Sequence, residues 1–321
     1  MKALQVTARG QAEFVDAPKP KLQPGHVLVR PRHLALCGSD IWFMDHAPND
    51  RFPCKVGTTG HEVIAEVVQV ADDCKGVFRS GELTLTLVPD HGGMAEFYLA
   101  PVENALSLPS KKSPEEYLMA QQLGTVIYAC RFVPTFIGKT VAIIGQGSAG
   151  IWFNVMCKRL GARRIIALDH HEHRLAVSQF YGADFAINGA AEDVLHQFAA
   201  CNEGEHADIV IEAAGRESSI NLSYELAKDF EGFILQFGLP RTPMQVDYGK
   251  MFWKRLNVKS MVHAAREPHH SSTRYALDLI DQELDVSRVI THRVDFDAVH
   301  RAFELQRTAS DGAIKTLVDM P

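Results

Sequence analysis

The sequence has no run of eighteen apolar residues and no excess of basic residues, and each absence excludes a class of protein. Without a long apolar run, no membrane-spanning segment is expected. The net charge of −6 and the pI near 6.2 argue against a nucleic-acid-binding protein, which would carry a basic face. The start, MKALQVTARGQAEF, lacks the charged-then-apolar pattern of a secretory signal. We therefore expect a cytoplasmic protein without membrane or nucleic-acid partners.

The cysteines form no C-x-x-C pair, so the sequence predicts neither a disulfide framework nor a compact four-cysteine zinc lobe. The six are scattered, at Cys37, Cys54, Cys74, Cys130, Cys157 and Cys201. Most thiols of this kind are small buried apolar side chains, and any other role must be argued from the neighbouring residues.

The length and composition that are present suit two ordinary domains. The chain has 321 residues, of which 46% are hydrophobic and 22% charged. Its first third contains short β-rich runs, such as Gly25 to Arg30 and Glu62 to Val68, separated by Gly and Pro. This pattern predicts a barrel-like β domain.

The middle third alternates buried strands with helices, which predicts a parallel sheet covered on both faces. The expected elements are strands Val141–Ile144, Arg164–Leu168, Asp208–Glu212 and Gly232–Phe237, with a helix over Ile151–Leu160 after the first strand. Beyond about Ala264, we expect helices over Thr273–Ile280 and Ala298–Gln306 and a closing strand, Ile314–Val318. The predicted domains are therefore 1–124, 125–262 for the nucleotide-binding sheet, and 263–321, which returns to the first domain.

A glycine-rich turn follows the first strand of the middle third. Gly145-Gln146-Gly147-Ser148-Ala149-Gly150 has the form G-x-G-x-x-G and opens a helix. The first glycine permits a tight turn, the second lets the backbone approach a pyrophosphate, and the third allows close packing of helix on strand. The free N–H groups at the helix start then face the phosphates. Glycine turns after strands are common, so the motif alone is a weak signal.

An acidic residue strengthens the prediction of a dinucleotide site. Asp169 closes the second strand, nineteen residues beyond Gly150, where a carboxylate can bind the adenosine ribose hydroxyls and repel a 2′-phosphate. NAD is therefore favoured over NADP. The alternative is that Asp169 only caps the next helix. Protonated His170 and His171 would tolerate a phosphate and so weaken the preference.

A candidate metal site lies in the β-rich part of the chain. Cys37 is 24 residues before His61, and Glu62 follows directly. A thiolate, an imidazole and a carboxylate together can hold zinc and leave one position open for a substrate oxygen. Taken separately, these residues would be a buried thiol, a loop histidine and a solvated strand end. The nicotinamide site predicted in the same chain favours the metal interpretation.

Taken together, these motifs resemble the zinc-containing medium-chain dehydrogenases, nearest to the sorbitol and polyol branch. The resemblance covers nearly the whole chain. It also includes Gly92-Gly93-Met94-Ala95-Glu96-Phe97, Glu212-Ala213-Ala214-Gly215, Thr291-His292-Arg293-Val294 and Ile314-Lys315-Thr316. The fold that it implies is α/β, with a GroES-like β-rich catalytic domain and an inserted Rossmann-type, doubly wound parallel sheet.

The resemblance also assigns roles at the metal. Cys37 and His61 would bind a catalytic zinc, and Glu62 would ligate the metal directly, as in the polyol branch, or lie behind it. Gln121 occupies the position of a further ligand, or of a partner to the water at the metal. A neutral amide is a poor zinc ligand, so we expect Gln121 to orient that water or the substrate. Ser39 would accept the proton of the substrate alcohol.

For the cofactor, the resemblance places Thr125, Phe237 and Gly238 at the nicotinamide, Arg174 at the adenosine ribose and Lys315 near the pyrophosphate. The complete predicted set is Thr125, Gly145, Gly147, Ser148, Ala149, Gly150, Asp169, Arg174, Ala214, Phe237, Gly238 and Lys315.

The chain departs from the family pattern in two places. The segment that carries the four-cysteine structural zinc in many relatives is missing, so one zinc per chain is expected. Trp42 stands where many relatives have a histidine that relays the proton outward. Trp42 could form a wall of the substrate pocket or belong to the core. The resemblance further implies a homodimer or homotetramer.

The activity implied by the resemblance is hydride transfer between NAD and a secondary alcohol, polyol or related hydroxy compound. Two other interpretations stay open. A zinc-free, NADPH-dependent enoyl or quinone reductase would share the fold but normally lacks the Cys37 and His61-Glu62 pattern. An inactive binding homologue would keep the fold without the chemistry.

Overall fold

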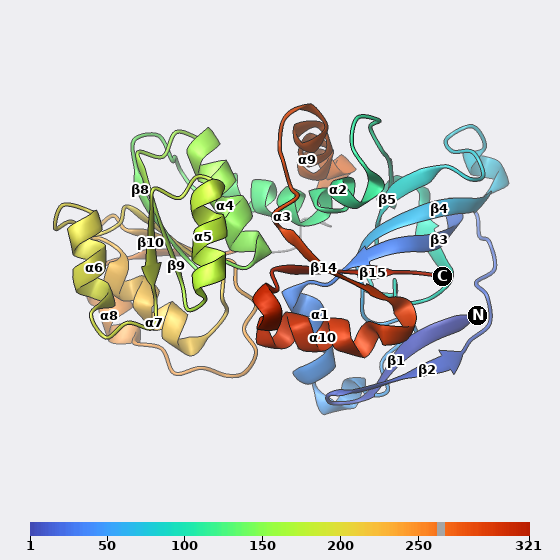
Figure 1. Ribbon diagram of the computed structural model, residues 1–321, viewed down its shortest axis with the longest axis horizontal. Helices are drawn as coiled ribbons and strands as arrows, with labels where there is room; N and C mark the ends of the chain where they lie inside the picture. Colours follow the sequence, from blue (N-terminus) through green and yellow to red (C-terminus); the bar gives the residue numbers. More distant parts are fainter. Residues whose placement is uncertain (262–266) are drawn as a thin grey trace. The chain divides into compact units, whose positions relative to one another are not determined.

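The computed structural model describes residues 1–261 and 267–321, which form two compact units (Figure 1). The first unit is Met1–Gly124 with Ala265–Pro321, and the second is Thr125–Ala264. The predicted boundary between residues 262 and 263 lies outside the described residues. None of the described helices has both the length and the apolar composition needed to cross a membrane.

The first unit is built on a seven-stranded sheet in which β15, from the end of the chain, pairs with β3. The strand order is β14-β15-β3-β4-β5-β7, with β6 also on β3, and β1 and β2 form a separate hairpin. The strands are β1 Lys2–Ala8, β2 Gln11–Asp16, β3 His26–Ala35, β4 Glu62–Val70, β5 Leu83–Leu87, β6 Tyr98–Pro101, β7 Ala105–Ser107, β14 Ile290–Asp295 and β15 Lys315–Asp319. The helices are α1 Gly38–Asp45, α2 Pro114–Leu118, α9 Ser271–Gln282 and α10 Val299–Thr308.

The C-terminal segment completes the core of this unit. Helix α10 packs against β14 and β15 (Figure 1), and its Val299 and Phe303 are buried in one hydrophobic cluster with Leu4 and Val63. Residues from both ends of the sequence therefore share one core, which explains why the last segment returns to the first domain.

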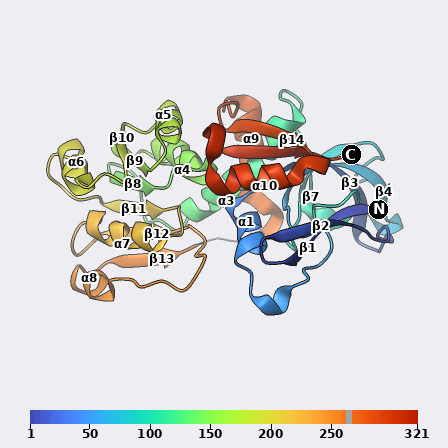
Figure 2. The same ribbon diagram turned by 60° about the horizontal axis from the view of Figure 1, so that its bottom comes forward.

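The second unit is a six-stranded sheet in which every pairing is parallel, in the order β10-β9-β8-β11-β12-β13 (Figure 2). The strands are β8 Thr140–Ile144, β9 Arg164–Asp169, β10 Phe185–Asn188, β11 Ile209–Glu212, β12 Phe233–Gln236 and β13 Asn257–Ser260. The helices are α4 Ser148–Arg159, α5 Glu172–Phe180, α6 Val194–Cys201, α7 Glu217–Leu226 and α8 Tyr248–Trp253. Helix α3, Ala120–Cys130, contains the boundary between the units.

The order of these strands reverses between β8 and β11. From β8 the chain proceeds outward through β9 to β10, and then returns to build β11, β12 and β13 on the other side. In such sheets, ligands bind outside the carboxyl ends of the strands at the reversal. The predicted doubly wound sheet is confirmed, and the glycine-rich turn lies at the end of β8, beside its reversal. The two edge strands, β10 and β13, were not predicted, because neither segment is a long apolar run.

We expect Phe303→Ala to destabilise the protein by about 3–5 kcal/mol, because the substitution leaves a cavity in the shared core. Phe303 is 2% exposed, whereas Phe252 on α8 is 56% exposed. The control variant Phe252→Ala should change the free energy of unfolding by less than about 0.5 kcal/mol. Urea unfolding of both variants measures the difference. Equal effects would contradict the packing of α10 described above.

Candidate metal centre and cofactor-binding residues

The register between β3 and β4 brings the candidate metal ligands together. Ala35, the last residue of β3, pairs with Glu62, the first residue of β4. Cys37 lies two residues beyond this pair on one strand, and His61 lies one residue before it on the other. The antiparallel pairing therefore brings Cys37 and His61 close together in space, although they are 24 residues apart in the sequence.

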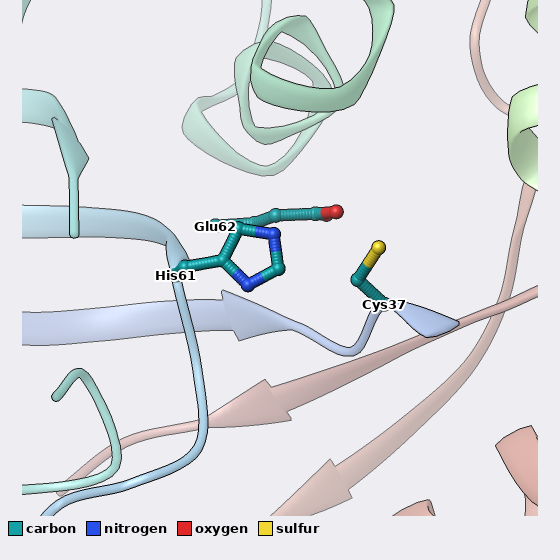
Figure 3. Close-up of side chains that lie close together, drawn as sticks. All are labelled: Cys37, His61 and Glu62. Carbon is teal, nitrogen blue, oxygen red and sulfur yellow. The ribbon is translucent and has the colours of Figure 1, made fainter. Parts of the chain in front are cut away.

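Cys37, His61 and Glu62 can each offer one ligand atom to a common site, and these atoms lie within 4.8 Å of one another. Figure 3 shows the three side chains reaching into one shared space, Cys37 from the segment after β3 and the other two from the start of β4. Glu62 is fully buried, whereas Cys37 and His61 are half-buried. A thiolate, an imidazole and a carboxylate at this spacing fit zinc and leave a fourth position open.

Asp40 joins the two segments that carry these residues. The Asp40 carboxylate is fully buried, and one oxygen accepts a hydrogen bond from the backbone N–H of Cys37 at 2.8 Å. Its other oxygen accepts from the N–H of Gly60 at 2.9 Å and lies 3.3 Å from Nδ1 of His61. With Nδ1 directed at a carboxylate, Nε2 of His61 is the nitrogen available to a metal.

The contact between Asp40 and His61 shifts the pKa of the two side chains in opposite directions. Burial alone would raise the pKa of Asp40, but the nearby rings of His61 and His91 hold that pKa well below its usual range. Burial would lower the pKa of His61, but Asp40 and the Cys37 thiol raise it well above its ordinary value. The negative charge of Asp40 thus favours a proton on the His61 ring, and a metal at Nε2 would take the place of that proton.

Glu62 forms a buried ion pair with Lys315 of β15. The Lys315 ammonium nitrogen lies 2.8 Å and 2.6 Å from the two Glu62 oxygens, and neither side chain is exposed to solvent. The lysine balances a carboxylate that would otherwise be costly to bury. The resemblance matched Lys315 to a basic group near the pyrophosphate; its described contact is with the candidate metal ligand, and the pyrophosphate role stays a prediction.

Two consecutive glutamines, Gln121 and Gln122, lie on α3. The side-chain amide that contacts Cys37 belongs to Gln122. Its Nε2 lies 3.6 Å from the Cys37 sulfur, and its Oε1 is buried without a hydrogen-bond partner among residues 1–261 and 267–321. Gln121, the predicted position, is half-buried on the same helix, α3. The resemblance to the family assigned this position to Gln121, whereas in the structure the side chain of Gln122 contacts the Cys37 thiol.

Two further residues of the predicted site lie on α1. The Ser39 hydroxyl is buried and has no hydrogen-bond partner within the described part of the chain, and its role toward the substrate stays a prediction. Trp42 is half-buried, and its ring packs edge-on against Phe43 with a centroid distance of 5.3 Å.

In the second unit, the three motif glycines have the environments that a nucleotide turn requires. Gly145 has φ +95°, a left-handed conformation that favours glycine. A Cβ on Gly150 would lie 1.8 Å from the Gly145 carbonyl oxygen, so this position needs glycine for helix–strand packing. A Cβ on Gly147 would meet nothing within 4 Å, so the backbone there borders open space. This space at the start of α4 fits a pyrophosphate.

Asp169, at the end of β9, is tied to the glycine-rich turn. Its carboxylate accepts backbone N–H hydrogen bonds from Gln146 at 2.6 Å and from His171 at 2.9 Å. Helix α5 has His171 as its N-cap, without a side-chain cap, so Asp169 does not serve as the helix cap. A carboxylate has about four acceptor sites, so these two hydrogen bonds are compatible with the ribose contact, which stays a prediction.

The other predicted cofactor residues lie at or near the carboxyl ends of strands, or on helices of the second unit. Ser148 and Ala149 are the first residues of α4, and Thr125 lies on α3. Ala214 follows β11 and donates its N–H to Glu212 at 2.9 Å. After β12, the ring of Phe237 packs against Phe153 at 5.0 Å, and Gly238 donates its N–H to the Glu212 carbonyl.

Arg174 lies on α5 near Asp169. Burial lowers the pKa of Arg174, whereas the nearby Asp169 carboxylate raises it. The guanidinium therefore lies within electrostatic reach of the predicted ribose acid.

Comparison with known proteins gives the same family as these motifs. The family model for zinc-binding dehydrogenases matches residues 150–282, and the model for the alcohol dehydrogenase GroES-like domain matches residues 23–110. The L-threonine 3-dehydrogenase of Shewanella woodyi is 27% identical over 94% of this chain and 94% of its own length. The alcohol dehydrogenase of Thermus sp. ATN1 has a TM-score of 0.82 at 22% identity, covering 100% of both chains.

A third similar protein was solved with a cofactor. A protein from Escherichia coli CFT073, described as a short chain alcohol dehydrogenase and complexed with NADH, has a TM-score of 0.85 at 21% identity, covering 99% of both chains. Together with the two family models, these matches show that the chain belongs to the zinc-containing medium-chain dehydrogenase family. It is thus a dehydrogenase with a GroES-like domain and a Rossmann-like sheet.

The two glutamines give a direct prediction. We expect Gln122→Ala to keep its metal but lose turnover by about 10–100-fold, because the amide contacts a ligand without replacing it. Gln121→Ala, the matched variant, should lose less. Metal content and kcat measured on the same preparations compare the two. A larger loss of kcat in Gln121→Ala than in Gln122→Ala would contradict this prediction and assign the role to Gln121, as the resemblance implied.

Proposed function

We propose that this protein is a zinc-dependent dehydrogenase that oxidises a secondary alcohol, polyol or related hydroxy compound with NAD. The observation that carries the proposal is the cluster of Cys37, His61 and Glu62, whose ligand atoms lie within 4.8 Å of one another. Metal-assisted hydride transfer needs a site for the metal and a site for the nicotinamide cofactor. The cluster would provide the first, and the G-x-G-x-x-G turn would provide the second.

At the metal, Cys37, His61 and Glu62 would hold one zinc, which as a Lewis acid lowers the pKa of an alcohol. Asp40 keeps His61 turned toward that position through the contact at Nδ1. The Ser39 hydroxyl, which has no hydrogen-bond partner among the described residues, would accept the alcohol proton at its oxygen and release its own proton to water. The Gln121–Gln122 pair orients the substrate from the side of Cys37.

At the cofactor, the N–H groups at the start of α4 and the open space at Gly147 would hold the pyrophosphate of NAD, which accepts the hydride. Asp169 would bind the ribose hydroxyls, with Arg174 beside it. Thr125, Phe237 and Gly238 would contact the nicotinamide portion. Repulsion between Asp169 and a 2′-phosphate favours NAD.

The experiment that tests the function is an alcohol panel run with metal analysis. We expect about one zinc per chain, because only one ligand set matches the family pattern. We also expect NAD-dependent turnover of at least one secondary alcohol from a set containing sorbitol, other polyols and L-threonine. Cys37→Ser should lose most of the zinc and most of the activity, whereas Cys201→Ser, on α6 of the other unit, should keep both. A protein that binds no zinc, or a Cys37→Ser variant that is unchanged, would refute the proposal.

The cofactor preference is a separate prediction. Asp169 should make kcat/KM for NAD exceed that for NADP, through ribose hydrogen bonds and phosphate repulsion. Asp169→Ser should narrow this ratio. The neighbouring Glu172→Gln variant, which removes one exposed charge from the same segment, should change it little. A wild-type preference for NADP would mean that His170, His171 and Arg174 bind the phosphate instead.

A further inference from the structure

A second histidine lies against the candidate metal cluster, and the proposed function assigns it no role. The ring of His91 is 4.3 Å from the His61 ring and 4.6 Å from the Phe43 ring, measured between centroids. Its Nδ1 is buried, has no hydrogen-bond partner among residues 1–261 and 267–321, and lies 3.5 Å from the same Asp40 oxygen that faces His61. His91, His61 and Asp40 can therefore be treated as one group around a single carboxylate oxygen.

The turn that carries His91 is fixed from several directions. Asp90 accepts hydrogen bonds from the Tyr98 hydroxyl at 2.8 Å and from the Gly92 N–H at 3.3 Å. Gly93 donates its N–H to the carbonyl of Gly60, the residue before His61, at 2.9 Å. His91 itself has φ +55°, a left-handed conformation that costs free energy for a histidine. The surrounding contacts hold the ring in place despite this cost.

Asp40 connects this group to the segments that carry the candidate metal ligands. Its carboxylate bonds to the backbone on both sides of the cluster, at Cys37 and at Gly60, and also faces the ring of His61. A donor that steadies this carboxylate therefore steadies the nitrogen and sulfur that would bind the metal. Groups that orient a metal ligand in this indirect way affect metal affinity strongly.

We propose that His91 is a positioning residue of the candidate zinc site. Its Nδ1 faces the Asp40 oxygen that also faces His61, and a proton on that nitrogen holds the carboxylate between the two rings. His61 is thereby kept directed toward Cys37 and Glu62. The inference rests on the proposed function, because it concerns the same metal. It adds a residue that no part of the sequence motif contains.

Two substitutions separate the donor from the ring. His91→Phe keeps an aromatic ring between Phe43 and His61 but removes the N–H group. His91→Asn removes the ring but keeps an amide N–H near the position of Nδ1, and asparagine tolerates the left-handed backbone. His300→Phe, an exposed position on α10, is the control for the substitution itself.

The measurements are the rate of zinc release to a chelator and the visible spectrum of the Co²⁺-substituted protein. We expect His91→Phe to release zinc about 10–100-fold faster and to change the cobalt spectrum. His91→Asn should stay close to the wild type, and His300→Phe should match it. If His91→Phe behaves as the wild type, or if His91→Asn is as impaired as His91→Phe, the inference is wrong. A wild-type protein that takes up neither metal would instead refute the proposed function.

Discussion

The pairing of β3 with β4 is the constraint on which the candidate metal centre depends. A shift of one residue in this register would move Glu62 to the other face of the sheet, because successive side chains on a strand point to opposite faces. The Asp40 carboxylate accepts hydrogen bonds from the backbone N–H groups of Cys37 and Gly60. These two bonds fix the loop segments that extend beyond the paired ends of β3 and β4. Sheet register thus sets the position of the ligands, and one buried carboxylate sets their orientation.

The strands and the motifs were predictable from the sequence because both depend on local patterns. The apolar runs that became β8, β9, β11 and β12 are continuous, and a buried parallel strand needs such a run. The Gly145–Gly150 turn follows a strand directly, so its neighbours identify it. By contrast, β13 (Asn257–Ser260) is short and largely polar, and only its pairing with β12 makes it a strand.

The contacts around the metal cluster were not predictable, because they join residues far apart in the sequence. Asp40 stood within the Cys37 motif, and an acid three residues after a cysteine was a usable but weak signal. No spacing rule pairs His91 with His61, or Gln122 with Cys37. The partner of Glu62 lies 253 residues away, on a strand whose motif had been matched to the cofactor.

The buried pair between Glu62 and Lys315 also concerns the order in which the chain is made. A ribosome delivers β4 long before β15, so a nascent chain holds an acid destined for the interior whose counter-charge has not yet been synthesised. Burying that acid alone is unfavourable. The strand that begins with Glu62 can therefore reach its final packing only after β15 has been made.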